Sequence, residues 1–250
     1  MKNRAYKNYI FDFYGTLVDI LTDEKDPVLW DKLAQLYQAY GADYKGEGLK
    51  KSYAKRVAQA RKELIEIKGV AYPEVDLVHI FNQLYVDARP QSSNSNQPED
   101  WGQLIAMVFR VLSRKHVTAY PHTKEVLAFL KEQGCRLYLL SNAQAAFTNA
   151  EIDLMELSPY FDAIYLSSDV GICKPQPEFL KQVLDDHGLN PSETVMVGND
   201  LTTDIAVAEA VGIDGILLNT FPYSRRELEN SPIKPDRVIT DIEALKTNFT

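Results

Sequence analysis

The sequence predicts an α/β protein, a parallel sheet covered by helices, with a helical domain inserted directly after the first strand. Two observations lead to this prediction. Beyond position 119, short apolar runs alternate with helical segments of roughly ten to fifteen residues, the pattern of a parallel sheet with both faces covered. Between the first apolar run and this region, positions 20–118 carry helical periodicity instead.

The first strand is predicted at residues 9–13, an aromatic and β-branched run that ends before Gly15 and Thr16. Helices are then expected where apolar residues recur every three or four positions, at about 26–41, 49–68, 75–88 and from Pro98 onward. The polar run 91–97 separates the last two helices as a loop. We therefore assign residues 1–19 and 119–250 to the α/β core and residues 20–118 to the helical insertion.

The second part of the chain alternates between predicted helices and predicted strands. The strands are expected at 136–140, 163–166, 194–197 and 215–218. The helices between them are expected at about 123–133, 178–187 and 204–211, with a further helix after the strand at 136–140. Because helical crossovers join these strands, we expect them to run parallel to one another.

Composition indicates an ordinary soluble domain. The chain has 250 residues, 45% hydrophobic and 25% charged, with a formal net charge of -8. An acidic balance without a basic cluster argues against nucleic acid or an anionic membrane as the main partner, and no apolar stretch reaches the roughly twenty residues of a membrane helix. Cys135 and Cys173 cannot form a disulfide framework. We expect a cytoplasmic monomer or homodimer.

Polar residues gather at or just after the ends of four predicted strands. In open α/β sheets, ligands bind beyond the carboxyl ends of the strands, so these residues are the candidates for a functional site. They are Asp12, Tyr14, Gly15 and Thr16, then Ser141 and Asn142, then Lys174, and finally Asn199, Asp200 and Asp204.

Four of these candidates also have an ordinary structural explanation. Asp12 could attack a phosphoryl or alkyl centre and form a covalent ester, but a strand-end Asp can also cap a turn. Ser141 could hold a phosphate oxygen or act as a helix N-cap. Lys174 could stabilise a transition state or lie solvated on the surface. Asp204 could bind a metal or simply favour the first turn of a helix.

In their order along the chain, these motifs resemble those of the haloacid dehalogenase-like hydrolase superfamily. Residues 11–17 are similar to its first motif, Ser141 ends the second, Lys174 matches the third and residues 198–204 resemble the fourth. Each motif is short, but the ordered set at matching strand ends is specific. The resemblance implies a Rossmann-like core and identifies the insertion at 20–118 as a helical cap between the first two motifs.

The resemblance also implies roles for the candidates. Asp12 would be the nucleophile, with Tyr14, Thr16 and Lys174 as the other catalytic residues. Gly15, Ser141 and Asn142 would bind the substrate. These assignments rest on the match of each residue to the motifs of the family.

A magnesium site is implied as well, because Mg²⁺ prefers oxygen ligands. Its ligands would come from Asp12, Tyr14 through its backbone carbonyl, Asn199, Asp200 and Asp204. Asn199 stands where the family more often has an Asp, and Asp200 follows it immediately. The sequence does not rank the last three residues as ligands.

Tyr14 stands two positions after Asp12, where phosphatases of the superfamily carry an Asp that acts as general acid and base. Tyr at this position is characteristic of the metal-independent 2-haloacid dehalogenases, since a halide leaves without a proton. Against a dehalogenase, the chain has no arginine between Arg4 and Arg56, and it has Leu180 where dehalogenases carry a tyrosine. The acidic fourth motif also resembles that of metal-dependent phosphatases.

We therefore predict a Mg²⁺-dependent phosphatase that acts on a small phosphomonoester through an aspartyl-phosphate intermediate. Two alternatives stay open. One is a metal-independent 2-haloacid dehalogenase, and the other is a phosphate-ester-binding protein that keeps the site but has lost turnover through Tyr14.

Overall fold

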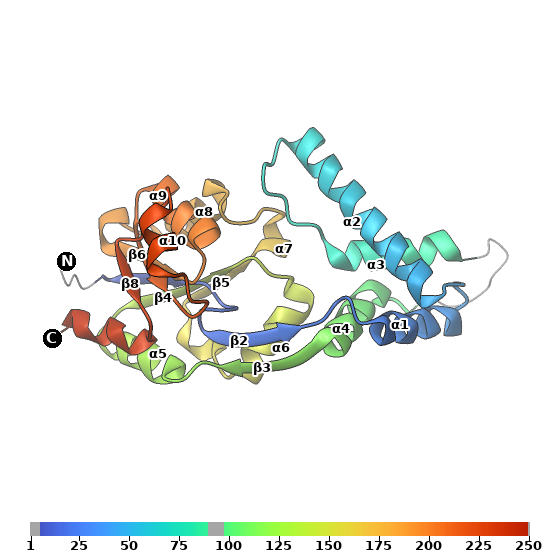
Figure 1. The fold of residues 1–250 in the computed structure, drawn as a ribbon, viewed down its shortest axis with the longest axis horizontal. Helices are drawn as coiled ribbons and strands as arrows, with labels where there is room; N and C mark the ends of the chain where they lie inside the picture. The colour runs from blue at the N-terminus through green and yellow to red at the C-terminus, as the bar shows by residue number, and fades with distance from the viewer. Residues whose placement is uncertain (1–5, 90–97, 250) are drawn as a thin grey trace.

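The computed structural model describes residues 6–89 and 98–249, which form an α/β core and a helical cap that lie side by side (Figure 1). The loop predicted at 91–97 lies outside the described residues. Within residues 6–89 and 98–249, none of the helices is both long and apolar enough to cross a bilayer.

The core is built on a six-stranded parallel sheet, which confirms the predicted α/β fold class. The strand order is β5-β4-β1-β6-β7-β8, so the first strand lies in the middle of the sheet. The strands are β1 (Asn8–Phe11), β4 (Arg136–Ser141), β5 (Ala163–Leu166), β6 (Thr194–Gly198), β7 (Asp214–Leu218) and β8 (Arg237–Ile239). Of these six strands, the sequence analysis missed only β8, because a segment of three residues is too short to show an alternation of apolar and polar residues.

Helices cover both faces of this sheet. Alternate residues of β1 point to opposite faces, so Tyr9 and Phe11 pack in one apolar layer and Ile10 packs in the other. The first layer contains α5 (Thr123–Glu132) and α6 (Ala145–Leu154), and the second contains α8 (Pro177–His187) and α9 (Ala206–Val211). The result is a three-layer α/β/α core.

Shorter elements complete the core. They are α7 (Ser167–Val170), α10 (Arg225–Asn230), 3-10 helices at Ser158–Tyr160, Pro191–Glu193 and Ile242–Phe249, and a π-helical turn at Leu201–Ile205. The π-helical turn leads directly into α9. The helix predicted at 204–211 therefore begins with the last two residues of this turn, Asp204 and Ile205, and continues as α9.

The cap contains four long helices with an apolar interior of their own. They are α1 (Pro27–Ala39), α2 (Gly46–Lys68), α3 (Leu77–Ala88) and α4 (Trp101–Ser113). Side-chain caps fix two of the starts, since Asp26 accepts from the Val28 N–H and Asp76 accepts from the His79 N–H. Aromatic residues dominate the interior, and the rings of Tyr37 and Trp101 meet edge to face at 5.1 Å.

An antiparallel ribbon joins the cap to the core, and the sequence analysis missed it. It consists of β2 (Val18–Thr22) and β3 (Arg114–Ala119), with Ile20 opposite Val117. Most residues of both strands are half-buried or exposed, so neither strand needs one fully apolar face. Their sequences therefore lack the clean apolar alternation that predicts a strand. The predicted boundaries at 19/20 and 118/119 therefore fall inside paired strands.

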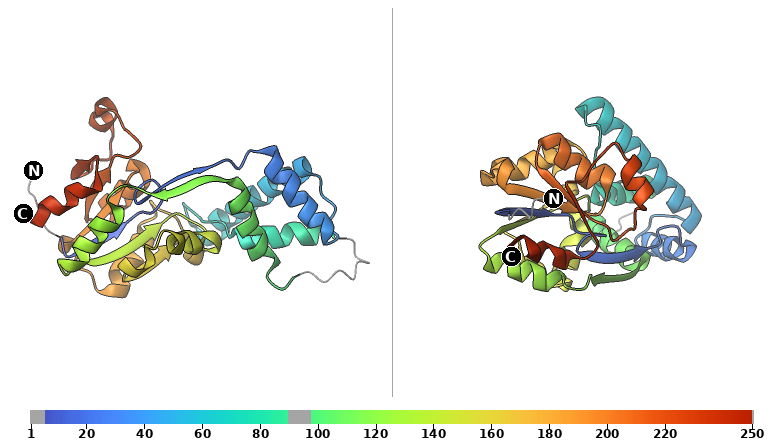
Figure 2. Two further views of the ribbon diagram at one scale, coloured as in Figure 1. Left: turned by 90° about the horizontal axis from the view of Figure 1, so that it is seen from below. Right: turned by 60° about the vertical axis from the view of Figure 1, so that its left-hand side comes forward.

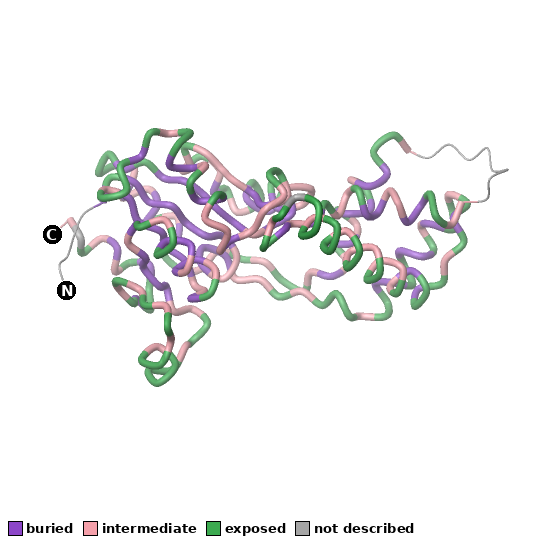
Figure 3. The backbone as a smooth tube through the Cα atoms, turned by 90° about the horizontal axis from the view of Figure 1, so that it is seen from above, coloured by how far each residue is buried: buried purple, intermediate pink, exposed green. Residues whose placement is uncertain are grey.

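Buried residues form one interior in the sheet and another in the cap, with a more exposed stretch between them (Figure 3). The side view in Figure 2 shows the ribbon running along this stretch from core to cap. The helix α6 links the two parts, because its Ala146 and Phe147 pack against the cap interior. The cap is thus held to the core by a few specific contacts.

The close approach of α3 and α4 gives a test of cap packing. A Cβ atom at Gly102 would lie 2.2 Å from the carbonyl oxygen of Val78. We expect Gly102→Ala to lower the free energy of unfolding by about 1–3 kcal/mol, because the backbones would have to separate. Urea unfolding measures this change.

The matched control is Gly48→Ala in α2, where an added Cβ would meet nothing within 4 Å. We expect this variant to be neutral or more stable by up to about 1 kcal/mol, since alanine restricts the unfolded chain. Equal effects of the two substitutions would contradict the close packing of α3 and α4.

Candidate active site

The sheet topology brings the predicted site together at one edge. The strands β4 and β6 flank β1 in parallel, with Leu139 and Val197 both opposite Phe11. The residues at or just after the ends of these three strands therefore emerge side by side. They are Asp12, Ser141 and Asn199, and the ribbon and cap extend from the same edge (Figure 1).

Asp12 is buried, and hydrogen-bond donors surround its carboxylate. Its Oδ1 accepts from the Ser141 hydroxyl at 3.2 Å and from Lys174 Nζ at 2.7 Å. Its Oδ2 accepts from the Thr16 hydroxyl at 3.2 Å. Three side chains from three loops thus fix the orientation of this carboxylate.

Lys174 is fully buried between two carboxylates. Its Nζ donates to Asp12 Oδ1, to Asp204 Oδ1 at 2.6 Å and to the Leu140 carbonyl at 2.7 Å. Burial alone would lower the pKa of this ammonium, but the facing carboxylates outweigh burial and raise the pKa above its ordinary value. The group is therefore a permanent cation at the centre of the site.

Asp204 is the inner acid of the fourth motif. Burial raises the pKa of Asp204 to about 6, although Lys174 opposes the rise. Because this pKa is still below 7, the carboxylate is ionised at neutral pH. Its Oδ2 also accepts from the Asp200 N–H at 3.0 Å. Asp204 thus holds the lysine from the side opposite Asp12.

Asp200 uses one carboxylate oxygen, Oδ1, to cap a turn, and its role as a metal ligand stays a prediction. Its Oδ1 accepts from the backbone N–H groups of Thr202 at 2.6 Å and Thr203 at 3.1 Å, and it caps the start of the π-helical turn. Asp200 is the N-cap of this turn, and Asp204 lies in its first turn, the position that the structural alternative expected for it. Similarly, the N-cap of α6 is Gln144, and the Ser141 hydroxyl faces Asp12.

Gly15 lets the first loop approach the fourth. It has φ of 81°, and a Cβ there would lie 2.5 Å from Asn199 Nδ2. The Thr16 hydroxyl lies 3.3 Å from Asn199 Oδ1 as well as 3.2 Å from Asp12 Oδ2. Two oxygen atoms thus converge on the same hydroxyl.

Asn142 uses its side chain to hold the backbone of Lys174. Its Nδ2 donates to the Lys174 carbonyl at 3.0 Å, and its Oδ1 accepts from the Lys174 N–H at 2.8 Å. This reciprocal pair fixes the second and third motifs relative to one another. The side chain of Asn142 therefore has a positioning role, and its assignment to substrate stays a prediction.

The hydroxyl of Tyr14 is directed to a buried carboxylate on α6. It donates to Glu151 Oε2 at 2.5 Å and lies 3.1 Å from the Thr148 hydroxyl. Burial raises the pKa of Tyr14 far above its ordinary value, and the hydrogen bond to Glu151 raises it further, although Arg110 opposes both. These contacts do not favour proton transfer from Tyr14 at neutral pH.

Glu151 connects Tyr14 to two arginines that sequence reasoning missed. Arg110 on α4 makes a bidentate pair with Glu151 at 2.8 and 2.9 Å, and Arg114 donates to it at 2.8 Å. The guanidinium of Arg110 also lies 5.1 Å from the centre of the Tyr14 ring. The spacing of Arg110, Arg114 and Glu151 in the sequence did not predict that these three side chains would meet beside Tyr14.

A cleft of about 360 Å³ lies between core and cap beside Tyr14. Its core wall includes Asn142, and its cap wall includes Arg61 and Arg110, with Glu24 at the ribbon end. A small ligand in this cleft would therefore contact both parts of the protein.

The oxygen atoms around the Thr16 hydroxyl are of the kind that a hard cation prefers. Asp12 Oδ2 and Asn199 Oδ1 lie around the Thr16 hydroxyl, and the Tyr14 carbonyl belongs to the same loop. Mg²⁺ binds through one or two carboxylates and keeps several waters, so this set is sufficient in number and type. Asp204, in contrast, is engaged by Lys174 and the Asp200 N–H.

Residues 6–212 match the haloacid dehalogenase-like hydrolase family. The chain belongs to this family of hydrolases. The resemblance stated from the motifs is thereby confirmed, and the ordered strand ends that carried it are the same ones that meet around Asp12.

Curated relatives of this family member are phosphatases. It is 30% identical over 130 residues to the ribulose-1,5-bisphosphate 5-phosphatase of Halopiger xanaduensis, a match that covers 52% of each chain. It is 30% identical over 131 residues to the glyceraldehyde 3-phosphate phosphatase of Methanothermobacter thermautotrophicus, covering 51% of this chain and 57% of the relative. The chain thus spans about half the length of the curated relatives it matches.

Solved structures of the family share the whole fold. A 2-haloacid dehalogenase from Pseudomonas syringae superposes with a TM-score of 0.65 at 21% identity, covering 98% of both chains. A HAD phosphatase from Thermococcus onnurineus superposes with a TM-score of 0.62 at 19% identity, covering 97% of both chains. At these identities the likeness shows the fold alone, and it does not separate the two activities.

Removal of the Tyr14 hydroxyl tests its link to Glu151. We expect Tyr14→Phe to lower the free energy of unfolding by about 1–3 kcal/mol, because a buried carboxylate loses a donor. Urea unfolding at neutral pH measures the change. A stability equal to that of the unmodified protein would contradict the contact.

The control is Tyr165→Phe, which removes a hydroxyl that donates to Asp186 at 2.8 Å in an exposed hydrogen bond. The expected loss is less than about 0.5 kcal/mol, since water replaces the bond.

Proposed function

We propose that this hydrolase is a Mg²⁺-dependent phosphatase that cleaves a small phosphomonoester through a covalent intermediate on Asp12. The phosphatase names of the curated relatives support the reaction class. The observation that carries the proposal is the fixed cation at Lys174, held 2.7 Å from Asp12 and 2.6 Å from Asp204. A cation in this place favours the approach of a dianionic phosphate to an anionic nucleophile.

The proposed reaction has two steps on Asp12. In the first, a carboxylate oxygen of Asp12 forms a bond to phosphorus while the ester oxygen leaves and takes a proton from water. In the second, water attacks the phosphorus, releases inorganic phosphate and regenerates the carboxylate. The Ser141 hydroxyl and Lys174 would bind the phosphoryl oxygens through both steps, and bound Mg²⁺ would neutralise phosphoryl charge.

The position of Tyr14 bears on the leaving group. Its hydroxyl donates to Glu151, so it is poorly suited to protonate a departing alkoxide. We therefore expect a preference for phosphates whose leaving group is a weakly basic anion, such as aryl phosphate esters or acyl phosphates. The same feature is the reason to keep a 2-haloacid dehalogenase as the second candidate, because halide departs without a proton.

A panel of phosphomonoesters with Mg²⁺ or EDTA tests the proposal. We expect phosphate release from aryl phosphates with Mg²⁺ and loss of this release with EDTA. Asp12→Asn should lower kcat by roughly a thousandfold or more, because the amide cannot form the ester. Phosphate release is measured with and without each addition.

A parallel assay with 2-chloropropionate distinguishes the candidates. Chloride release that persists in EDTA would overturn the phosphatase and favour the dehalogenase. If neither product forms, tight phosphate-ester binding that survives Asp12→Asn would identify a binding protein.

The neutral side chain of Asn199 leads to a prediction about metal affinity. Asn199→Asp adds a charged ligand beside Asp12, so we expect Mg²⁺ to bind roughly tenfold more tightly. The rise in Tm during a MgCl2 titration measures this affinity without a substrate. Asp200→Asn, on the capping carboxylate, is the matched control and should leave the Mg²⁺ affinity unchanged. The reverse order of effects would move the metal site to Asp200.

A further inference from the structure

The cap segment 72–75 lies against the core turn that precedes the catalytic lysine. The Cys173 N–H donates to the Tyr72 carbonyl at 2.8 Å, and the Glu74 N–H donates to the Gly171 carbonyl at 3.0 Å. Together they form a short antiparallel bridge between cap and core. The backbone leading to the third motif is thus paired with the cap.

The carboxylate of Glu74 adds side-chain bonds to the same junction. Its Oε1 accepts from Gln144 Nε2 at 2.9 Å, and its Oε2 accepts from the Ser167 hydroxyl at 2.5 Å and from Cys173 Sγ at 3.3 Å. Gln144 lies three residues after Ser141 in the second motif loop. One cap carboxylate therefore contacts the loops of both the second and the third motifs.

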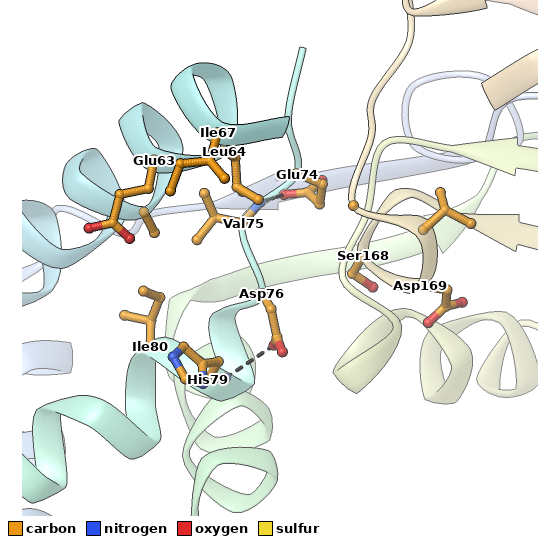
Figure 4. Close-up of a pocket in the computed structure, with 13 residues that line it drawn as sticks. Glu63, Leu64, Ile67, Glu74, Val75, Asp76, His79, Ile80, Ser168 and Asp169 are labelled. Atoms are coloured by element: carbon orange, nitrogen blue, oxygen red, sulfur yellow. Dashed lines mark hydrogen bonds between the residues drawn. The ribbon is translucent and has the colours of Figure 1, made fainter. Parts of the chain in front are cut away.

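All of these donors are neutral. Among residues 6–89 and 98–249, no ion pair within 4 Å involves Glu74, and side chains of Gln144, Ser167 and Cys173 hold its carboxylate. Figure 4 shows it between the cap segment and the short helix α7, which carries Ser168 and Asp169. A carboxylate with this many directed donors has a defined position only while cap and core are in contact.

The two loops that Glu74 contacts also hold the reacting groups. Asn142 ties them together inside the core through the backbone of Lys174. Glu74 ties them together from the cap, through Gln144 on one side and Cys173 on the other. Both connections are within three residues of Ser141 or Lys174, so a shift in either would displace the groups around Asp12.

We infer that Glu74 is a positioning residue, whose contacts from the seated cap hold Ser141 and Lys174 in their reactive places. This inference deepens the proposed phosphatase function and rests on it for its kinetic part. It also fits the shape of the protein, because Glu74 and Val75 line both the inner cleft and an outer groove of about 510 Å³. Release of this segment would therefore open the inner cleft outward and loosen both loops.

Amide hydrogen exchange tests the inference without a substrate. We expect Glu74→Gln to speed exchange at 72–75 and at 171–174 by roughly tenfold or more, because an amide cannot accept from all three donors. The control is Glu63→Gln, which removes an exposed charge from the outer groove. Exchange at 171–174 that is the same in both variants would overturn the inference.

Kinetics with p-nitrophenyl phosphate and Mg²⁺ give the second readout. We expect Glu74→Gln to lower kcat roughly 10- to 100-fold with a smaller change in KM, and Glu63→Gln to leave both unchanged. A purely structural role would lower Tm but leave kcat per folded molecule intact, and that result would contradict positioning.

A double variant completes the test. Cys173→Ala removes one of the three core donors to Glu74, so the double variant should be no more than about twofold worse than Glu74→Gln alone. Fully additive losses would place the two residues in separate roles and overturn the inference. If the unmodified protein hydrolyses no phosphomonoester, the proposed function fails, while hydrogen exchange still decides the role of Glu74.

Discussion

The buried ammonium of Lys174 is the interaction on which the rest of the site depends. It lies between the carboxylates of Asp12 and Asp204, and its removal would leave two buried carboxylates close together without a cation between them. This requirement explains the surrounding polar bonds. The Leu140 carbonyl, the Ser141 hydroxyl and the Asp200 N–H each take up a remaining donor or acceptor of the three charged groups.

The part of this arrangement that follows from the topology of the parallel sheet was predicted from the sequence. A parallel sheet must place the carboxyl ends of neighbouring strands together, so Asp12, Ser141 and the fourth motif meet whatever the details of the side chains. Periodicity likewise predicted the four cap helices, because each buries one apolar stripe. Both predictions depend on patterns that are local in the chain.

The rest depends on partners far apart in sequence. Nothing near Tyr14 indicates that its hydroxyl meets Glu151, which is 137 positions away. The paired strands β2 and β3 were missed for the same reason. Neither segment has a clear apolar alternation in its sequence, and each is stabilised as a strand by pairing with the other. In the fourth motif, spacing could not tell Asp200 from Asp204, because the π-helical turn decides which carboxylate points inward.

These distant contacts also determine how firmly the cap is held. On one side, Phe147 packs into the cap interior, and Glu151 pairs with Arg110, so separation there would expose apolar surface and unpaired buried charge. On the other side, Glu74 and the 72–75 segment make hydrogen bonds to neutral groups. A bond between neutral backbone groups contributes typically about 1 kcal/mol, and a bond accepted by a carboxylate contributes about 1.5–3 kcal/mol. The two sides of the cleft therefore differ in chemistry, and the side held by hydrogen bonds from neutral donors is the one that contacts the loops of Ser141 and Lys174.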